Sequence, residues 1–383
     1  MRILFTSIVG TGHITPLLPY AKEMLRQGHE VRVAAPGELA SKISDAGLTH
    51  MPTSRPSVAE REAIFRSIEH LTSDERQGAL MRGFFAGLLP RTSFPGLLRF
   101  AEDWRPDLIV RESGEFAGPL VAAKLGIPHV RVSVCNGHRM LTEAPAFDEL
   151  LHEFGLDPDG GAMLRQARAF SSFPASMEPP DGDAAVLPQF RVAPVTPPMS
   201  EGRPDWMSDT DEPNIYMTFG TVVGSFDKGK AFIRAALDAV GSLKLRALMT
   251  TGGTVDVTAI GAIPENVVLR EFVPQNAVFP HVSAVLCHGG SGSVLGALAA
   301  GLPLVVTPVS ADQPENAVSV AACGAGLAVD TPKANILAEE VQKVLMNPAY
   351  ATAARQVATE MVAQASLEEA VVEMLRQTST TKD

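Results

Sequence analysis

The chain has 383 residues, of which 45% are hydrophobic and 20% are charged. This composition excludes an intrinsically disordered chain, and the length favours two or three domains. The net charge of −11 argues against a nucleic-acid-binding protein, which would carry a basic stripe. An anionic ligand must then be held by backbone N–H groups and neutral donors.

The three cysteines, Cys135, Cys287 and Cys323, form no C-x-x-C pair. Apolar neighbours predict that Cys287 and Cys323 are buried thiols. We therefore expect a protein of the reducing cytoplasm that holds no metal cluster.

Two segments bear on location and partners. A strand expected at residues 3–7 follows the first two residues directly, which leaves no space for a signal peptide. Residues 289–311 carry no charge, but Gly301-Leu302-Pro303 divides them into a helix and a strand. Neither a membrane nor a nucleic acid is an expected partner, and both a monomer and a homodimer stay open.

In the first half, short aliphatic runs alternate with amphipathic helical stretches, which predicts a parallel α/β sheet. The first helix is expected to have Thr15 as its N-cap, Pro16 at its first position and Gly28 at its end. Its expected apolar face consists of Leu17, Leu18, Ala21, Met24 and Leu25. The strands are expected at residues 3–7, 31–35, 108–110 and 129–133.

Residues 54–98 break this alternation. They are helical in pattern and contain Phe65, Met81, Phe84 and Phe85. Long insertions on α/β scaffolds are usually functional. The alternative is a helical hairpin that closes the edge of the sheet, and the sequence leaves both interpretations open.

The second half repeats the alternation after a proline-rich stretch. Residues 174–213 contain nine prolines, and residues 196–213 are the predicted linker between two domains. The Asp-x-Asp triplets at 181–183 and 209–211 lie in this stretch, so we interpret them as solvated linker and not as a metal site. The strands are expected at residues 215–219, 245–250, 267–269, 284–287, 304–306 and 327–329.

A glycine-rich turn, His288-Gly289-Gly290-Ser291-Gly292-Ser293, follows the strand at 284–287 and precedes a helix at 294–300. The glycines allow close approach of a ligand to the backbone, and a helix N-terminus offers free N–H groups and a positive dipole end. The turn therefore predicts a pyrophosphate site. A tight turn without a ligand is the structural alternative.

Asp312 and Gln313 follow the next strand, and Pro314 opens another helix. An acid and an amide together can bind several sugar hydroxyls as acceptor and donor. The alternative is that Asp312 caps the helix, and the two interpretations are compatible.

Gly10-Thr11-Gly12-His13 ends the first strand of the chain. It resembles the start of a dinucleotide fingerprint, but position 15 is threonine and the second strand ends without an acid, which argues against a nicotinamide site. The turn presents His13 instead, and an imidazole at a sheet edge can act as a general base at neutral pH. Glu112 ends a parallel strand at the same edge and can hold one ring nitrogen of this histidine.

Together the two halves resemble a family 1 glycosyltransferase of the GT-B fold. More narrowly, the chain is similar to the actinobacterial enzymes that glycosylate macrolides, enediynes and aromatic polyketides. The resemblance covers nearly the whole chain. The motifs that carry it are Gly12-His13-Ile14-Thr15-Pro16-Leu17, Thr218-Phe219-Gly220-Thr221, Phe272-Val273-Pro274-Gln275, His288 to Ser293, and Ala311-Asp312-Gln313 with Asn316.

The resemblance implies two Rossmann-like, doubly wound domains that face each other across a cleft. Residues 1–195 would bind the acceptor, and residues 214–364 would bind a TDP- or UDP-sugar. Residues 365–383 would form a C-terminal helix that crosses back to the first domain. The nucleotide sugar is a co-substrate, and neither a metal nor another cofactor is implied.

The resemblance also implies roles for the residues already singled out. His13 would deprotonate a hydroxyl of a hydrophobic aglycone, and the (deoxy)sugar would be transferred in one step with inversion. Glu112 would orient His13, although family members commonly carry aspartate at this position. Apart from the resemblance, the composition of the insertion predicts the acceptor-binding residues: Phe65, Met81, Phe84 and Phe85 are large apolar side chains that could form a pocket over His13. Nucleotide- and pyrophosphate-binding residues would be Gly220, Thr221, Val273, Gln275, His288, Gly289, Gly290, Gly292 and Ser293, and Asp312 and Gln313 would face the donor sugar.

Two other classes of function remain as alternatives. A nucleotide-sugar epimerase or hydrolase on the same fold would need an acid–base set inside the donor site, where the sequence offers only Asp312 and His288. A non-catalytic, nucleotide-binding helper protein would have no use for His13 with Glu112. The sequence does not identify the acceptor, the sugar or the preferred nucleotide.

Overall fold

The computed structural model describes residues 1–136, 144–157, 162–178, 189–195, 206, 212–221, 223–225, 227–253, 255 and 258–378. Within these, the chain forms two compact units. The first comprises residues 1–171, 180–192 and 365–383, and the second comprises residues 172–179 and 193–364. The Asp-x-Asp triplets and most of the predicted linker lie outside the described residues.

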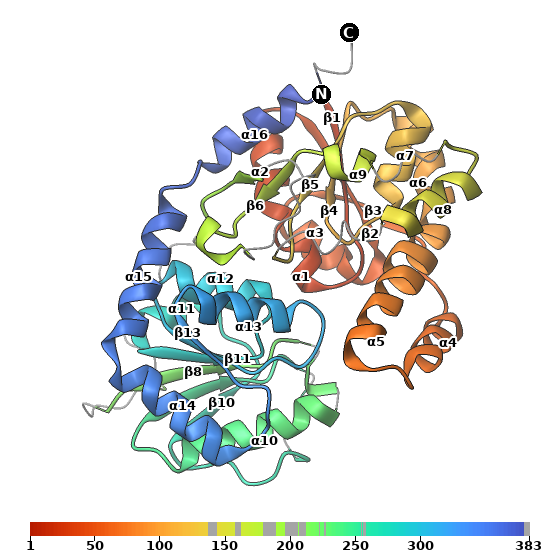
Figure 1. The fold of residues 1–383 in the computed structure, drawn as a ribbon. Coiled ribbons are helices and arrows are strands. Elements are labelled where there is room, and N and C mark those ends of the chain that lie inside the picture. Colours follow the sequence, from red (N-terminus) through yellow and green to blue (C-terminus); the bar gives the residue numbers. More distant parts are fainter. Residues whose placement is uncertain are drawn as a thin grey trace. The chain divides into compact units, whose positions relative to one another are not determined.

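The first unit contains a parallel sheet of seven strands in the order β3-β2-β1-β4-β5-β6-β7 (Figure 1). The order reverses between β1 and β4, and such a switch point is where open α/β sheets bind ligands. The strands are β1 (Arg2–Thr6), β2 (Glu30–Pro36), β3 (Thr49–Thr53), β4 (Leu108–Glu112), β5 (His129–Val132), β6 (Ala169–Ser171) and β7 (Phe190–Arg191).

Helices cover both faces of this sheet because successive strand residues point to opposite faces. On one face, Phe5 and Val110 pack in a core with Met24; on the other, Leu4 and Ile109 pack with Phe94. The helices are α1 (Thr11–Ile14), α2 (Leu18–Arg26), α3 (Ala40–Asp45), α4 (Val58–Ile68), α5 (Ser73–Leu80), the π-helix η2 (Met81–Leu88), α6 (Leu89–Trp104), α7 (Ala117–Leu125), α8 (Ala144–Glu153), α9 (Ala162–Gln166), α16 (Leu367–Arg376) and the short 3₁₀ helix η1 (Gly37–Leu39).

The prediction for the first helix was wrong in detail. Gly10 has φ of 133°, a value open to glycine, and its carbonyl accepts bonds from the N–H groups of His13 and Ile14, which starts α1 at once. Thr15 therefore lies in a turn, and α2 begins only at Leu18, with Leu17 at its N-cap. Leu25, expected on the apolar face, is 42% exposed.

Strands β3, β6 and β7 were missed by the sequence analysis. β3 carries the residues Thr-His-Met-Pro-Thr and lies at the edge of the sheet, where proline is tolerated. β6 and β7 have three and two residues, too few to form a pattern. Residues 54–98 are helical as expected, and α6 packs its apolar side into the sheet core.

The second unit contains a parallel sheet of six strands in the order β10-β9-β8-β11-β12-β13. The order reverses between β8 and β11. The strands are β8 (Asn214–Thr218), β9 (Arg246–Thr250), β10 (Val267–Arg270), β11 (Ala284–Cys287), β12 (Leu304–Val306) and β13 (Gly326–Ala328). Each predicted strand end in this unit lies within one residue of the observed end.

Helices also cover both faces of the second sheet, with α10 and α14 on one face and α12, α13 and α15 on the other (Figure 1). Cys287 is buried in the second of these cores, whereas Cys323 is only half-buried, so its predicted burial was wrong. The helices are α10 (Asp227–Gly241), α11 (Gln275–Val278), α12 (Ser291–Ala299), α13 (Gln313–Ala322), α14 (Ala334–Met346), α15 (Pro348–Val362) and the short 3₁₀ helices η4 (Ala175–Met177), η5 (Val223–Ser225) and η6 (Phe279–His281).

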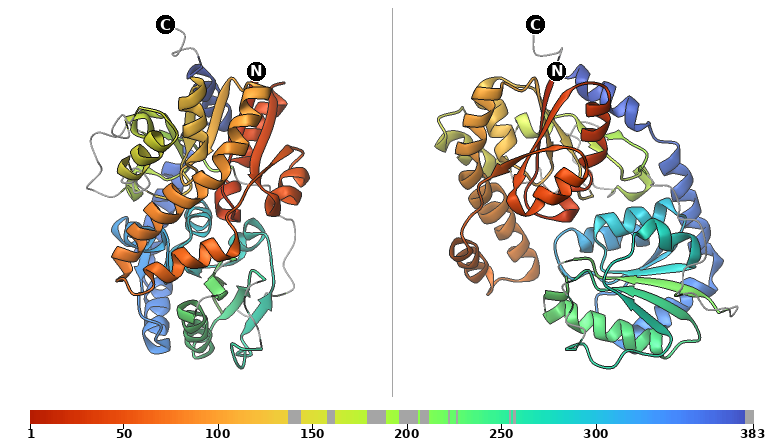
Figure 2. Two further views of the ribbon diagram at one scale, coloured as in Figure 1. Left: turned by 90° about the vertical axis from the view of Figure 1, so that its right-hand side faces the viewer. Right: turned by 180° about the vertical axis from the view of Figure 1, so that it is seen from behind.

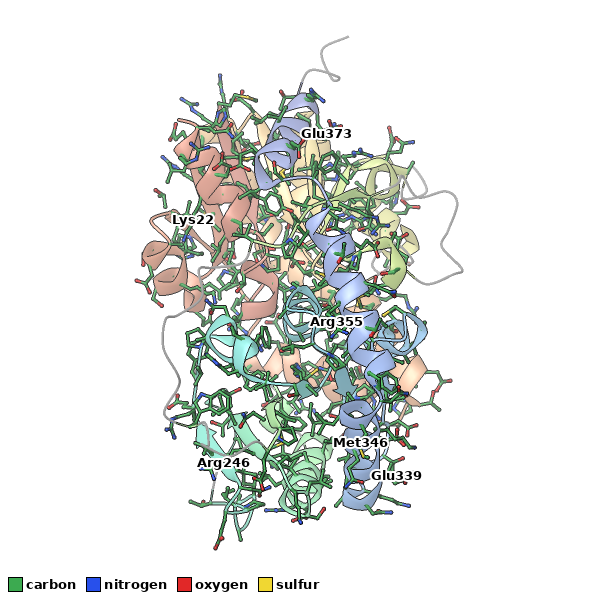
Figure 3. All side chains as sticks on the ribbon, turned by 90° about the vertical axis from the view of Figure 1, so that its left-hand side faces the viewer. Lys22, Arg246, Glu339, Met346, Arg355 and Glu373 are labelled. Carbon is green, nitrogen blue, oxygen red and sulfur yellow. The ribbon has the colours of Figure 1, made fainter. Side chains whose placement is uncertain are left out.

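The C-terminal helix α16 belongs to the first unit. Its N-terminus is fixed by a capping box between Ser366 and Glu369. Ala370, Val371 and Met374 are buried in the core that α2 shares, and α16 lies alongside α2 (Figure 2). Figure 3 labels Glu373 on α16. Its carboxylate lies 3.5 Å from Arg168 Nε, and both side chains are partly buried. In the described part of the chain, no helix has the length and apolarity needed to cross a membrane.

Candidate active site

The carboxyl ends of β1 and β4 bring together the two residues proposed for acid–base chemistry. β1 and β4 are hydrogen-bonded neighbours, with Thr6 opposite Arg111 in register. His13 stands on α1, which follows β1, and Glu112 is the last residue of β4. His13 Nδ1 lies 3.1 Å from Glu112 Oε1.

The two side chains of this contact differ in their exposure to solvent. The Glu112 side chain has no exposed surface, whereas 27% of the His13 side chain is exposed. Because a carboxylate can only accept, this close contact favours the proton on Nδ1, which leaves Nε2 as the basic nitrogen. Its second oxygen, Oε2, accepts a hydrogen bond from the N–H of Gly114. Glutamate therefore reaches His13 while its other oxygen is held by the turn after β4.

A second carboxylate, that of Glu115, accepts hydrogen bonds at the other end of the same turn. Glu115 accepts hydrogen bonds from the hydroxyl of Thr6 at 2.6 Å and from the N–H groups of Ala117 and Gly118 at 2.7 and 2.9 Å. It stands at the N-terminus of α7, where a negative charge is favoured. Burial raises the pKa of Glu115, and the Thr6 hydroxyl opposes that shift. Glu115 thus connects the end of β1 to the start of α7.

The aromatic residues of the insertion lie next to His13. The ring centroids of His13 and Phe85 are 6.4 Å apart, those of Phe84 and Phe85 are 5.3 Å apart, and those of Phe65 and Phe84 are 5.7 Å apart. Phe84 and Phe85 are half-buried and Phe65 is 49% exposed, whereas Met81 is buried. Phe84 and Phe85 belong to the π-helix η2, a geometry that occurs frequently at functional sites. We call Phe65, Phe84 and Phe85 the aromatic run.

A small cavity of about 30 Å³ lies at the carboxyl ends of β1, β2 and β3, large enough for about one water molecule. Its wall is mostly apolar, although several lining residues carry a hydroxyl group, and Ile8 and Val9 lead into the turn that carries His13. Its lining residues are Thr6, Ser7, Ile8, Val9, Ala34, Pro36, Thr53, Ser54, Arg55, Leu89, Ser93, Leu97 and Glu115.

In the second unit, the glycine-rich turn stands at the switch point between β8 and β11. Gly289 has φ of 89°, and a Cβ there would lie 2.7 Å from a methyl carbon of Val306, so only glycine fits. Gly290 is the N-cap of α12 and supplies no side-chain cap. Around Gly292, a Cβ would meet no atom of the described chain within 4 Å. The first turn of α12 therefore opens into free space with its N–H groups uncapped by a side chain.

His288 is held at the base of this turn. Its side chain is buried, and Nδ1 lies 3.4 Å from the carbonyl oxygen of Thr218. Because a carbonyl only accepts, Nδ1 carries the proton and Nε2 is an acceptor in the neutral ring. Nε2 points between two glycines: a Cβ on Gly220 or Gly290 would lie 2.8 or 2.5 Å from it. Burial lowers the pKa of His288, which the Thr218 carbonyl and Asp312 partly oppose.

Asp312 is tied to the glycine turn, and its side chain does not cap its own helix. It occupies the N-cap position of α13 without a side-chain cap, so the capping interpretation was wrong. Its Oδ2 accepts hydrogen bonds from the Ser291 hydroxyl and, at 3.0 Å, from Asn316 Nδ2. Asn316 also donates to the carbonyl of Gly289 at 2.8 Å. Gln313 Oε1 accepts from the N–H groups of residues 309 and 310, which leaves its amide nitrogen as the donor toward a ligand.

The residues expected near the nucleotide also fall in this unit. Gln275 Nε2 donates to Ser293 Oγ at 3.1 Å, so the start of α11 contacts the start of α12. Val273 packs against the core, whereas its neighbour Phe272 is 75% exposed. Thr221 is exposed next to Gly220, which has φ of 66°. The predicted donor-site residues therefore lie on the loops that follow strands β8, β10, β11 and β12, or in the first turns of the helices after those loops.

Two family models match long segments of the chain. Residues 23–148 match the erythromycin biosynthesis protein CIII-like N-terminal domain, and residues 234–377 match the corresponding C-terminal domain. The L-demethylnoviosyl transferase of Streptomyces niveus is 31% identical over 86% of this chain and 85% of its own length. The chain belongs to this family of antibiotic glycosyltransferases.

Solved structures of antibiotic glycosyltransferases share the fold. SnogD from Streptomyces nogalater is 26% identical, with a TM-score of 0.76 over 99% of each chain. SsfS6 from Streptomyces sp. SF2575, solved with thymidine diphosphate, is 26% identical, with a TM-score of 0.77 over 98% of this chain and 99% of its own. The two parallel-sheet domains of this glycosyltransferase are therefore of the GT-B type.

Sequence reasoning named Asn316 in a motif but gave it no role, and it missed other residues of the site. Asn316 holds both Asp312 and the glycine turn, and its spacing of four residues from Asp312 was the signal for that contact. Glu115 was missed because a second acid near Glu112 has the same local pattern. The cavity residues at 53–55 were missed because β3 itself was not recognised.

Proposed function

We propose that this glycosyltransferase transfers a (deoxy)sugar from a TDP- or UDP-sugar to a hydroxyl of a hydrophobic aglycone with inversion, using His13 as the general base. The observation that carries the proposal is the 3.1 Å contact between His13 Nδ1 and the buried Glu112 carboxylate. An alcohol is a poor nucleophile, so a base within hydrogen-bond reach accelerates its attack. As the ring takes the acceptor proton, Glu112 stabilises the imidazolium.

The donor is assigned to the second unit. The N-terminus of α12 and His288 would hold the diphosphate, which gains charge as the sugar leaves. Asp312 keeps one oxygen for a sugar hydroxyl while Oδ2 is engaged by Ser291 and Asn316, and Gln313 supplies an N–H donor. Thymidine diphosphate is named in the structure of the relative SsfS6, which supports a TDP-sugar. We assign no metal ion or cofactor to the transfer, and activity that persists in a chelator is the expected result.

The acceptor is assigned to the first unit. The aromatic run and Met81 would form an apolar wall next to His13, where half-exposed rings can cover an apolar aglycone. The reaction places the acceptor oxygen at the anomeric carbon as the bond from that carbon to the diphosphate oxygen breaks. The acceptor proton goes to His13 Nε2.

The test is incubation with TDP- and UDP-sugars, with and without phenolic or macrolactone alcohols. We expect nucleotide diphosphate to be released only when an acceptor is present, and NMR of the product should show an inverted anomeric centre. Release without an acceptor would indicate hydrolysis, and retained configuration would contradict the single displacement.

A further inference from the structure

Arg111 lies directly before Glu112 on β4, and the proposed transfer step does not involve it. Its side chain is 1% exposed. One of its nitrogens, Nη1, lies 3.2 Å from each of three main-chain oxygens, those of Glu112, Ser113 and Glu115. The guanidinium therefore stands inside the turn between β4 and α7, with the carbonyl groups of that turn directed at it.

The same turn fixes the Glu112 carboxylate. The N–H of Gly114 binds Glu112 Oε2, and the N–H of Glu115 binds the Glu112 carbonyl at 3.2 Å. The turn is anchored at its far end, where the Glu115 carboxylate binds Thr6 and the first N–H groups of α7. Loss of the three Arg111 contacts would leave the middle of the turn without its central donor, and charge-assisted donors of this kind are about twice as strong as neutral ones.

A buried guanidinium at this position is costly. Arg131 stands opposite Arg111 in register on β5 and is also buried, at 2% exposure, so two positive charges lie side by side. Burial, and to a smaller extent the positive charge of Arg131, lowers the pKa of Arg111 to about 9. An aliphatic residue would avoid this cost. In return, Arg111 donates hydrogen bonds to the carbonyl groups of the turn, which an aliphatic residue cannot do.

We propose that Arg111 is a positioning residue for the transfer: through the carbonyl groups of the β4–α7 turn, it holds the Glu112 carboxylate against His13. The inference rests on the proposed function of His13 and Glu112. It assigns no contact between Arg111 and substrate.

The experiment compares Arg111→Met with Arg131→Met. Both positions are buried, on neighbouring strands and in register, and both changes remove one charge. Of these two arginines, Arg111 donates to the turn carbonyls, and no such bond from Arg131 is found in the described part of the chain. We expect Arg111→Met to lower kcat by about ten- to a hundredfold with little change in the donor KM, because a small misplacement of a catalytic group has effects of this size. Arg131→Met should leave kcat per folded enzyme near the wild-type value.

The titration of the His13 ring, followed by NMR, gives a readout independent of turnover. The charged groups on the elements around it are Glu112, Arg111, Glu115 and Arg131. If Arg111 holds Glu112 in place, Arg111→Met moves the midpoint of the His13 titration to lower pH, because the carboxylate is lost from Nδ1. Arg131→Met removes a positive charge and leaves the turn intact, so it moves the midpoint to higher pH or not at all. The two variants are thus expected to differ in sign.

Equal loss of thermal stability in both variants, with unchanged kcat and a His13 midpoint that moves alike, would show that Arg111 is only structural. If Arg111→Met does not fold, Arg111→Lys carries the test: it keeps the charge but not the planar fork, and we expect a partial loss of kcat and a smaller shift to lower pH. An unchanged Arg111→Lys midpoint would then overturn the proposal. Failure of the base assignment is seen separately, since it would leave His13→Ala active whatever Arg111 does.

Discussion

When His288 binds a diphosphate, its imidazole ring should take up a proton from solvent. In the neutral ring Nδ1 carries the hydrogen that the Thr218 carbonyl accepts, so Nε2 has none to donate. A diphosphate oxygen can only accept. The donor can therefore bind Nε2 only when the ring is protonated, and burial holds the pKa of His288 below its usual value in the free protein.

The sign of the pH dependence follows from this. A bound diphosphate favours the imidazolium and raises the pKa of His288, so the affinity is highest below the free pKa. It then falls by up to about tenfold per pH unit until the bound pKa is reached, where it levels off. The charge-assisted bond contributes about 1.5–3 kcal/mol, so the total loss is about one to two decades.

The assay is titration calorimetry of a TDP-sugar, without acceptor, in buffers of different ionisation enthalpy between pH 6 and pH 8.5. An intact nucleotide sugar avoids the titration of a terminal phosphate. We expect wild-type binding to take up a fraction of a proton, roughly 0.5–0.8 for a pKa rise of one to two units, with the maximum midway between the free and the bound pKa of His288. His288→Gln keeps an N–H donor that needs no proton, so its affinity should be nearly independent of pH. Equal proton uptake by both proteins, or none by the wild type, would refute the reasoning.

Three further predictions test other parts of the structure. Glu112→Gln keeps a hydrogen-bonding side chain but removes the charge, so we expect a smaller loss of rate than for His13→Ala and a shifted pH–rate profile; an unchanged rate and profile would make Glu112 structural. Phe84→Ala should change the acceptor preference while the domain stays folded, and hydrogen exchange should show residues 54–98 becoming protected when an aglycone binds; an unfolded variant would assign Phe84 to the core instead. Burial, with help from Arg111 and Arg131, lowers the pKa of His129 to about 3, so its contribution to stability is present above about pH 6.5 and is lost as the pH falls toward 3. In denaturant unfolding of His129→Gln, the free energy of unfolding should change less between pH 6.5 and pH 3 than in the wild type. The same pH dependence in both proteins would contradict this assignment to His129.

The ends of the strands could be predicted from the sequence because each aliphatic run stops at a polar residue. His13, Glu112 and His288 all follow such runs, and parallel strands place these ends at one edge of a sheet. The pairing of His13 with Glu112 needed one further fact, that β1 and β4 are neighbours. The glycine turn could also be predicted from its three glycines after a strand. The structure gives the reason for one of them, because Gly289 has no room for a side chain.

Other features depend on contacts that no local pattern encodes. The sequence predicted Phe85 near His13, but not the π-helix η2 that carries it, because apolar spacing does not distinguish a π-helix from an α-helix. Glu112 and Glu115 lie three residues apart, and only the three-dimensional turn decides which carboxylate faces His13. The two buried arginines looked like ordinary polar positions in short strands, because burial on the crowded face of the sheet is set by helices distant in sequence.

The central claim is that His13 is the base of the transfer, and His13→Ala tests it most directly. The variant is assayed with an alcohol acceptor, while donor binding is measured by calorimetry as the control for folding. We predict that donor affinity stays close to the wild-type value and that the rate of transfer falls by roughly 10²–10⁴-fold, with a smaller loss for a strongly acidic phenol that needs little help to ionise. Near-wild-type turnover of the alcohol by His13→Ala would contradict the account.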